Sequence, residues 1–154
     1  KMVPPAYRSI KNSEIQEIEI ENGMIRLLAG EYEGTKGYKS KYLPLDYYDI
    51  HLDAGASITL NTEQDRSIML FTLLGDAYIA DELITEKTAV KLTDGTRVSI
   101  KAADKNVQVL FVSSAYLGEP IAWGGPIVMN TREELQKAFD DLNKGTFLQS
   151  EISY

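Results

Sequence analysis

The sequence predicts an all-β fold, a small barrel, with one helix at its C-terminal end. Three observations support this fold class. Short apolar runs recur at a spacing of roughly 8–12 residues, separated by Gly, Asp and Asn, which is typical of sandwiches and barrels. Helical periodicity is confined to one segment near the C-terminus. A length of 154 residues suits one domain with a real core.

The first elements are an extended arm and a hairpin. Residues 1–13 are expected to form the arm or a linker, because Pro4 and Pro5 fix φ and lack an amide hydrogen. Isoleucines alternate with acidic residues over Glu14–Ile20, which predicts a strand. Asn22-Gly23 is a typical two-residue turn, and Met24–Gly30 is the returning strand.

The barrel is expected to cover residues 14–130. Residues 31–42 contain two glycines and three lysines and are expected to be a mobile loop. The strands predicted after this loop are Tyr47–Leu52, Ser57–Leu60, Ser67–Leu74, Ala77–Ile79, Ala89–Leu92, Thr96–Ile100 and Val107–Val112.

Residues 131–154 are expected to form the helix and a tail. Thr131 and Glu134 have the spacing of a capping box, in which each side chain bonds the backbone amide of the other. Gly145 stands where a C-terminal cap belongs. Four apolar residues between them follow the i, i+3, i+4, i+7 pattern of a helix face: Leu135, Ala138, Phe139 and Leu142.

Composition excludes several kinds of function. There is no cysteine, so disulfides, thiolate metal sites and cysteine nucleophiles are absent. The single histidine argues against sites with several imidazoles and against a Ser-His-Asp triad. A net charge of −7 disfavours direct nucleic-acid or anionic-membrane binding. No apolar run reaches the roughly 20 residues of a membrane span, and no signal sequence is recognised, so we expect a cytoplasmic protein without membrane contact.

Four segments resemble the pirin family, in the order in which that family has them. The longest is Ile121–Glu134, with the sequence IAWGGPIVMNTREE, and the others are Lys1–Tyr7, Leu28–Tyr32 and Leu117–Pro120. Pirins are bicupins, with two barrels in one chain, and the resemblance covers only the C-terminal barrel. It implies a cupin-type barrel, a jelly-roll-like pair of sheets, with Lys1-Met2 in the linker between barrels. If the source is eukaryotic, it also implies a nuclear location.

The resemblance places iron in the N-terminal barrel, outside this chain. Cupins hold metal through spaced His-x-His, Glu and His positions between glycines. Frames laid on Gly55 and Gly95 put an amide, a carboxylate, an isoleucine and a second amide at these positions: Asn61, Glu63, Ile68 and Asn106. Such a set cannot replace three imidazoles and a glutamate. We therefore expect no metal, no cofactor and no catalytic residue in this chain.

Two other groups of residues are candidates for function. Alternation puts Asp49, His51 and Asp53 on one strand face, where they would bind a divalent cation weakly or act as an acid–base pair. The favoured interpretation is that these three residues form the solvent-exposed polar face of a strand whose other face is buried. Trp123 and Met129 are interface candidates. For Trp123, core packing is the default and contact with an N-terminal barrel is the alternative.

Three functional hypotheses remain, in order of preference. In the first, the chain is a non-catalytic domain that packs against an iron-binding N-terminal cupin or self-associates. The resemblance then gives the whole protein a quercetin dioxygenase activity or a role as a redox-sensing transcription cofactor. In the second, it is a stand-alone barrel that binds a small apolar or aromatic ligand. In the third, it is a metal-free enzyme that uses Glu63, His51 or a tyrosine for proton transfer.

Overall fold

The structure, a computed structural model, describes residues 3–150 and 152 and confirms a mostly β fold with one C-terminal helix. The chain forms two compact units. The larger unit comprises residues 10–116. The smaller comprises residues 117–150 and 152 together with residues 3–9. The expected interdomain linker position at Lys1-Met2 lies outside the described residues.

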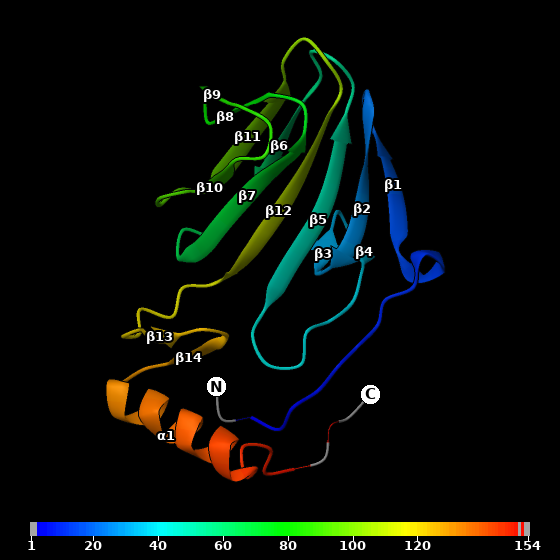
Figure 1. Cartoon of the computed structure of the whole chain (residues 1–154). Helices are drawn as coiled ribbons and strands as arrows, with labels where there is room; N and C mark the ends of the chain where they lie inside the picture. Colours follow the sequence, from blue (N-terminus) through cyan, green and yellow to red (C-terminus); the bar gives the residue numbers. More distant parts are fainter. Residues whose placement is uncertain (1–2, 151, 153–154) are drawn as a thin grey trace. The chain divides into compact units, whose positions relative to one another are not determined.

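The larger unit contains a six-stranded antiparallel sheet (Figure 1). Its order is β1-β2-β5-β12-β7-β10, so the centre is made by strands far apart in the sequence. The bounds are Gln16–Ile20 for β1, Gly23–Ala29 for β2, Leu45–Leu52 for β5, Val107–Ala115 for β12, Arg66–Leu74 for β7 and Ala89–Lys91 for β10. A short 3-10 helix, Asn12–Glu14, precedes β1.

A four-stranded sheet packs against the first and has the order β6-β11-β8-β9. Its bounds are Ser57–Asn61 for β6, Arg97–Ala102 for β11, Ala77–Ile79 for β8 and Glu82–Ile84 for β9. The two sheets share one core but remain separate in their hydrogen bonding. The barrel is therefore an open, cupin-like sandwich.

The core lies between the sheets and follows from alternation along the strands. In β6 and β11 every second residue is buried, and the residues between are exposed. Apolar side chains from both sheets interdigitate in this layer, as in other two-sheet folds. The most deeply buried include Ile25, Leu27, Ile50, Leu52, Leu70, Ile100 and Val109.

Residues 31–42 differ from the expected loop, because they begin with a small hairpin. Strand β3 (Glu31–Tyr32) pairs with β4 (Thr35–Lys36). The turn residues Glu33 and Gly34 both have positive φ, 45° and 84°, as two-residue turns of this kind require. Strands of two residues are too short to show a period in the sequence.

The smaller unit contains a hairpin and the helix. Strands β13 (Ala122–Gly124) and β14 (Ile127–Met129) pair, and their hairpin packs against helix α1 (Arg132–Lys144). The predicted caps are confirmed: Thr131 and Glu134 form the capping box, and Gly145 has a left-handed conformation. The hairpin groups with the helix in the smaller unit, whose C-terminal part begins at residue 117. In the described part of the chain, no helix is long and apolar enough to cross a membrane.

Candidate functional site

A cavity of about 380 Å³ opens at one end of the barrel unit. The ends of strands β5, β6, β7 and β12 and the β3–β4 hairpin position its lining, which is Glu31, Asp46, Tyr48, Asn61, Thr62, Glu63, Arg66, Phe111 and Ser113. A hollow of about 440 Å³ on the outer side of the four-stranded sheet is lined mainly by Thr and Ser side chains. Arg97 is its one ionisable lining residue, so the first cavity, hereafter the mouth, is the better candidate.

The guanidinium of Arg66 is the central charge of the mouth. Arg66 Nη2 donates a hydrogen bond to Asp46 Oδ2 at 3.3 Å, and Arg66 Nε lies 3.2 Å from Glu63 Oε2. Arg66 Nη1 is buried without a hydrogen-bond partner, and the side chain is only 15% exposed. Arg66 is held there because it begins β7 and its amide closes a turn onto the Glu63 carbonyl.

Asp46 is the less exposed of the two carboxylates that face Arg66. Burial raises its pKa above the usual value of 3.8, although Arg66 and a backbone hydrogen bond from Glu31 act in the opposite direction. Gly30 makes room for Asp46, since a Cβ at Gly30 would lie 2.3 Å from Asp46 Oδ1.

Aromatic rings form one wall of the mouth. Tyr48 stacks on Phe111 with a centroid separation of 5.3 Å and meets Tyr32 edge-on at 6.0 Å. The Tyr48 hydroxyl donates a 2.6 Å hydrogen bond to the Glu31 carbonyl. Burial, the largest cause, raises the pKa of Tyr48, so this phenol is a hydrogen-bond donor and not a proton-transfer group near neutral pH.

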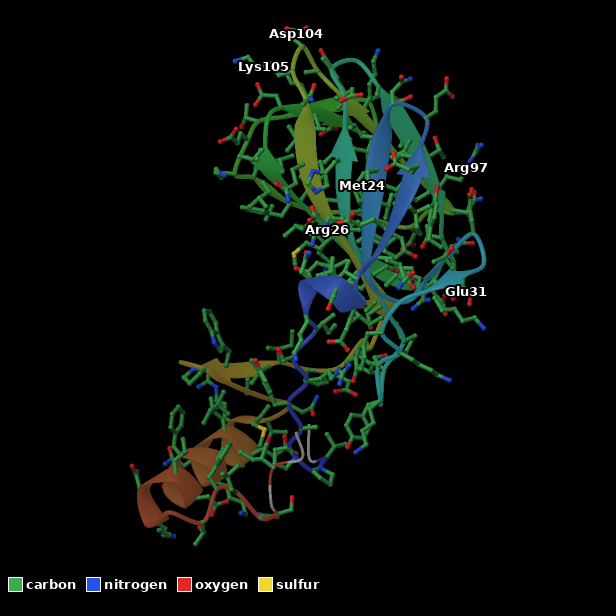
Figure 2. The ribbon with its side chains drawn as sticks, turned by 90° about the vertical axis from the view of Figure 1, so that its right-hand side faces the viewer. Met24, Arg26, Glu31, Arg97, Asp104 and Lys105 are labelled. Carbon is green, nitrogen blue, oxygen red and sulfur yellow. The ribbon has the colours of Figure 1, made fainter. Side chains whose placement is uncertain are left out.

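The four positions of the cupin ligand frame do not come together. Asn61 and Glu63 line the mouth, and Ile68 is buried in the core. Asn106 lies at the other end of the barrel, where it accepts a hydrogen bond from the Ala54 amide and donates one to Asp53. Figure 2 shows Asp104 and Lys105, which precede Asn106 in the sequence, at one end of the barrel unit and Glu31 toward the other.

The mouth does not fit an iron ion. Arg66 already pairs with both Asp46 and Glu63, so a metal ion would have to compete with the guanidinium for these carboxylates. The glutamate position of the first frame holds the apolar Ile68, which has no atom that could bind a metal. Within residues 3–150 and 152, no three His, Cys, Asp or Glu side chains are grouped so as to hold a metal.

Asp49, His51 and Asp53 are only partly together. His51 Nε2 lies 3.1 Å from Asp49 Oδ1, but its alignment falls short of a hydrogen bond. Asp49 accepts hydrogen bonds from Arg26 and Gln108 at 3.3 and 2.8 Å and is 5% exposed, so the expectation of a fully wet face is wrong at this residue. Asp53 lies beyond the end of β5.

Of the interface candidates, Trp123 is 75% exposed, so core packing, the default expectation, is wrong. Its indole Nε1 donates a 2.6 Å hydrogen bond to the Gly125 carbonyl. Val128 stands opposite Trp123 on the same exposed face of the hairpin, and Met129 is half-buried.

The residues that sequence reasoning missed are Arg66 and Asp46. Each lies an even number of residues from buried core residues of its own strand, so its side chain is on the inward face. Charged side chains are unusual at such positions. The sequence could have indicated an ion pair through the opposite charges at these two inward positions. Only the strand register shows that Arg66 and Asp46 lie close enough to form it.

The family model described as the Pirin C-terminal cupin domain matches residues 47–148. Human pirin is 31% identical over 147 residues, which cover 92% of this chain and 50% of pirin. A pirin-like protein of Caulobacter vibrioides is 31% identical, with 96% and 54% covered. The crystal structure of quercetin 2,3-dioxygenase from Acinetobacter baumannii superposes with a TM-score of 0.82 at 30% identity, covering 92% of this chain and 50% of that one. The chain thus spans about half the length of these relatives, and it belongs to the pirin family as a C-terminal cupin domain.

Proposed function

We propose that this chain is a metal-free, non-catalytic cupin domain that packs against an iron-binding N-terminal cupin barrel in a pirin-type protein. One observation carries the proposal: Arg66 occupies the mouth and pairs with Asp46 and Glu63, the carboxylates that a metal would need. On this proposal the mouth has a structural role, because the Arg66 ion pairs link the start of β7 to β5 at this end of the barrel.

The iron chemistry of the whole protein belongs, on this proposal, to the N-terminal barrel. The relatives have about as much chain again as the part that this sequence covers. By similarity to the Acinetobacter protein and the family, the whole protein oxygenates a flavonol such as quercetin or acts as a redox-sensing transcription cofactor. We assign it to the cytoplasm, or to the nucleus if its source is eukaryotic.

Two measurements test this function. The intact mass of the protein from its own source should be about twice the 17.2 kDa of this chain. Metal analysis of this chain alone, after incubation with ferrous iron and removal of the excess, should find no stoichiometric iron. A mass of 17.2 kDa would contradict the two-barrel proposal. One iron per chain, lost in an Asp46→Asn variant, would contradict the metal-free proposal.

A second candidate function is a metal-free barrel that binds a small apolar or aromatic ligand. The aromatic wall of Tyr48 and Phe111 beside a cavity of about 380 Å³ favours it. A bound flavonol should raise the melting temperature by mass action. Asn61→Trp should fill the mouth and abolish the shift, while Ser57→Trp, at the far end of the same exposed strand face, should preserve it. The absence of any shift with the unmodified chain would remove this candidate.

A further inference from the structure

One segment of the barrel unit carries a charge opposite to that of the whole chain. The chain has a net charge of −7, but residues 36–43, with the sequence KGYKSKYL, contain three lysines and no acidic residue. We call these residues the basic segment. Its lysines, Lys36, Lys39 and Lys41, are all exposed. A patch of one sign on a molecule of the other sign attracts partners of complementary charge and orients them as they dock.

The barrel unit holds the basic segment in place. The Gly37 amide donates a 2.9 Å hydrogen bond to the Gly30 carbonyl, and the Gly30 amide donates one of 3.0 Å to the Tyr38 carbonyl. Just after the segment, the Pro44 carbonyl accepts a 2.7 Å hydrogen bond from the Ser114 hydroxyl. Between these anchors the chain extends beyond the ends of strands β4 and β5 (Figure 1). Binding therefore costs less conformational entropy than it would in an unanchored loop.

Exposed aromatic and apolar side chains stand beside the lysines. Tyr38, Tyr42 and Leu43 are all exposed. Lys41 Nζ lies 5.5 Å from the centroid of the Tyr42 ring, which is a cation–π contact. The basic segment thus offers contact area as well as charge, and tyrosine is among the residues that contribute most to interfaces.

The carboxylates of the barrel unit leave most of this positive charge available. Lys36 Nζ lies 4.0 Å from Glu31 Oε2, and the two side chains are 77% and 56% exposed. An ion pair of this length and exposure is weak. Among the residues that the structure describes, neither Lys39 nor Lys41 forms a salt bridge. The ammonium groups of the basic segment can therefore bind carboxylates of another molecule.

We propose that the basic segment docks a short acidic stretch of another protein, in which Asp or Glu residues are interspersed with apolar ones. The carboxylates pair with Lys36, Lys39 and Lys41, and the apolar side chains pack on Tyr42 and Leu43. Docking at this surface uses neither the mouth nor the two-barrel function, so it can fail or succeed independently of both.

A polypeptide fits this surface better than a nucleic acid does. The net charge of −7 repels a long polyanion, and three lysines neutralise only a few phosphates. Lys41 also lies over the Tyr42 ring, which leaves less of this ring for stacking with a base. A short acidic peptide needs neither a long run of positive charge nor a free aromatic face.

Fluorescence anisotropy of the 154-residue chain with a labelled peptide tests the proposal. The probe is a fluorescein-labelled peptide of repeated Glu-Glu-Leu, used at about 0.1 M salt, where the Debye length is about 10 Å. We expect saturable binding of this peptide and none of a Gln-Gln-Leu peptide. The variant Lys36→Glu/Lys39→Glu/Lys41→Glu should weaken binding by about tenfold or more, because three attractive contacts become repulsive.

A matched control variant separates the basic segment from the overall charge. It makes the same change in net charge at three exposed lysines outside the segment: Lys91→Glu, Lys101→Glu and Lys105→Glu. It should weaken binding by no more than about threefold, because these lysines act only through the screened field of the whole chain. If the basic-segment variant does not fold, Lys36→Gln/Lys39→Gln/Lys41→Gln takes its place, with an expected loss of about fivefold.

The absence of saturable peptide binding would overturn the proposal, and so would an equal loss in both glutamate variants. Tighter binding of a labelled oligothymidylate of similar length would assign the segment to nucleic acid instead. A dimer seen by light scattering without peptide, and lost in the basic-segment variant, would assign it to a second copy, whose strand β1 carries Glu17 and Glu19. Failure of the intact source protein to bind the peptide would also overturn the proposal, because another part of that protein would then cover the segment.

Discussion

Gly30 and Asp46 pack so closely that no side chain fits between them. A Cβ on Gly30 would lie 2.3 Å from Asp46 Oδ1 and 2.9 Å from the Leu45 carbonyl oxygen. Gly30 also has a φ of 90°, a conformation that side chains rarely adopt. The mouth therefore depends on Gly30. This glycine directly precedes Glu31, whose backbone amide donates a hydrogen bond to the Asp46 carboxylate.

Gly30→Ala should destabilise the chain strongly. Left-handed strain costs about 1–2 kcal/mol, and displacement of Asp46 from Arg66 adds to it, so we expect about 3–4 kcal/mol in the free energy of unfolding. Gly34→Ala is the matched control, because Gly34 has a φ of 84° but nothing within 4 Å of its Cβ position. Urea unfolding of both variants measures the difference. Equal losses would show that backbone strain, and not the contact with Asp46, decides.

Arg66→Met should destabilise the chain because it leaves the half-buried Asp46 without its counter-charge. Breaking a fully buried pair costs about 3–5 kcal/mol, and partial solvent access here reduces the expected loss to about 2 kcal/mol. In the double variant Arg66→Met/Asp46→Asn, the losses should be clearly less than additive. Lys137→Met, which removes an exposed pair with Asp141, should leave the free energy of unfolding almost unchanged. A similarly small loss for Arg66→Met would mean that the mouth is solvated like the surface.

The sequence predicted the parts of the fold that depend on local pattern. The helix was placed correctly because Thr131, Glu134 and Gly145 satisfy its ends within a few residues. The β1–β2 hairpin was expected from Asn22-Gly23, and it forms, but its two turn residues are Glu21 and Asn22, because Ile20 pairs with Gly23. Asn22 has a φ of 54°, and a Cβ on Gly23 would meet the His51 carbonyl at 2.3 Å. The hairpin β13–β14 was missed, because its three-residue strands are too short to establish a period.

The mouth was harder to predict because long-range register assembles it. Asn61 faces Arg97 at one end of β6, while Asn106 caps the opposite end of the barrel. A motif frame counts residues along the chain and assumes the length of each turn, so it grouped two residues that the fold separates. Arg66 and Asp46 meet only because β7 and β5 both pair with β12.

Asp46 and Asp141 should make the free energy of unfolding depend on pH in opposite directions. The pKa of Asp46 is raised by burial, so the folded state holds this proton more tightly than the unfolded state. Its contribution is therefore present below about pH 3.8 and is lost as the pH rises through the folded-state pKa. The pKa of Asp141 is lowered, first by a hydrogen bond from Lys137, so its contribution is present above about pH 3.8 and is lost on acidification.

Urea unfolding of the unmodified chain, Asp46→Asn and Asp141→Asn from about pH 3 to about pH 6 measures these slopes. Compared with Asp46→Asn, the unmodified chain should become less stable as the pH rises. Compared with Asp141→Asn, it should become more stable as the pH rises. Slopes of the same sign would contradict the assignment of burial as the main influence on Asp46.

Trp123→Ala should separate the interface role of Trp123 from a core role. Because Trp123 is 75% exposed, its removal should change the free energy of unfolding by no more than about 0.5 kcal/mol. Ile127→Ala on the buried face of the same hairpin should cost about 2–3 kcal/mol. Against a separately produced N-terminal barrel, calorimetry should find binding weakened by about 2 kcal/mol, roughly 30-fold, for Trp123→Ala. Unchanged affinity would remove Trp123 from the proposed interface, and a loss of stability comparable to that of Ile127→Ala would assign it to the packing of the hairpin.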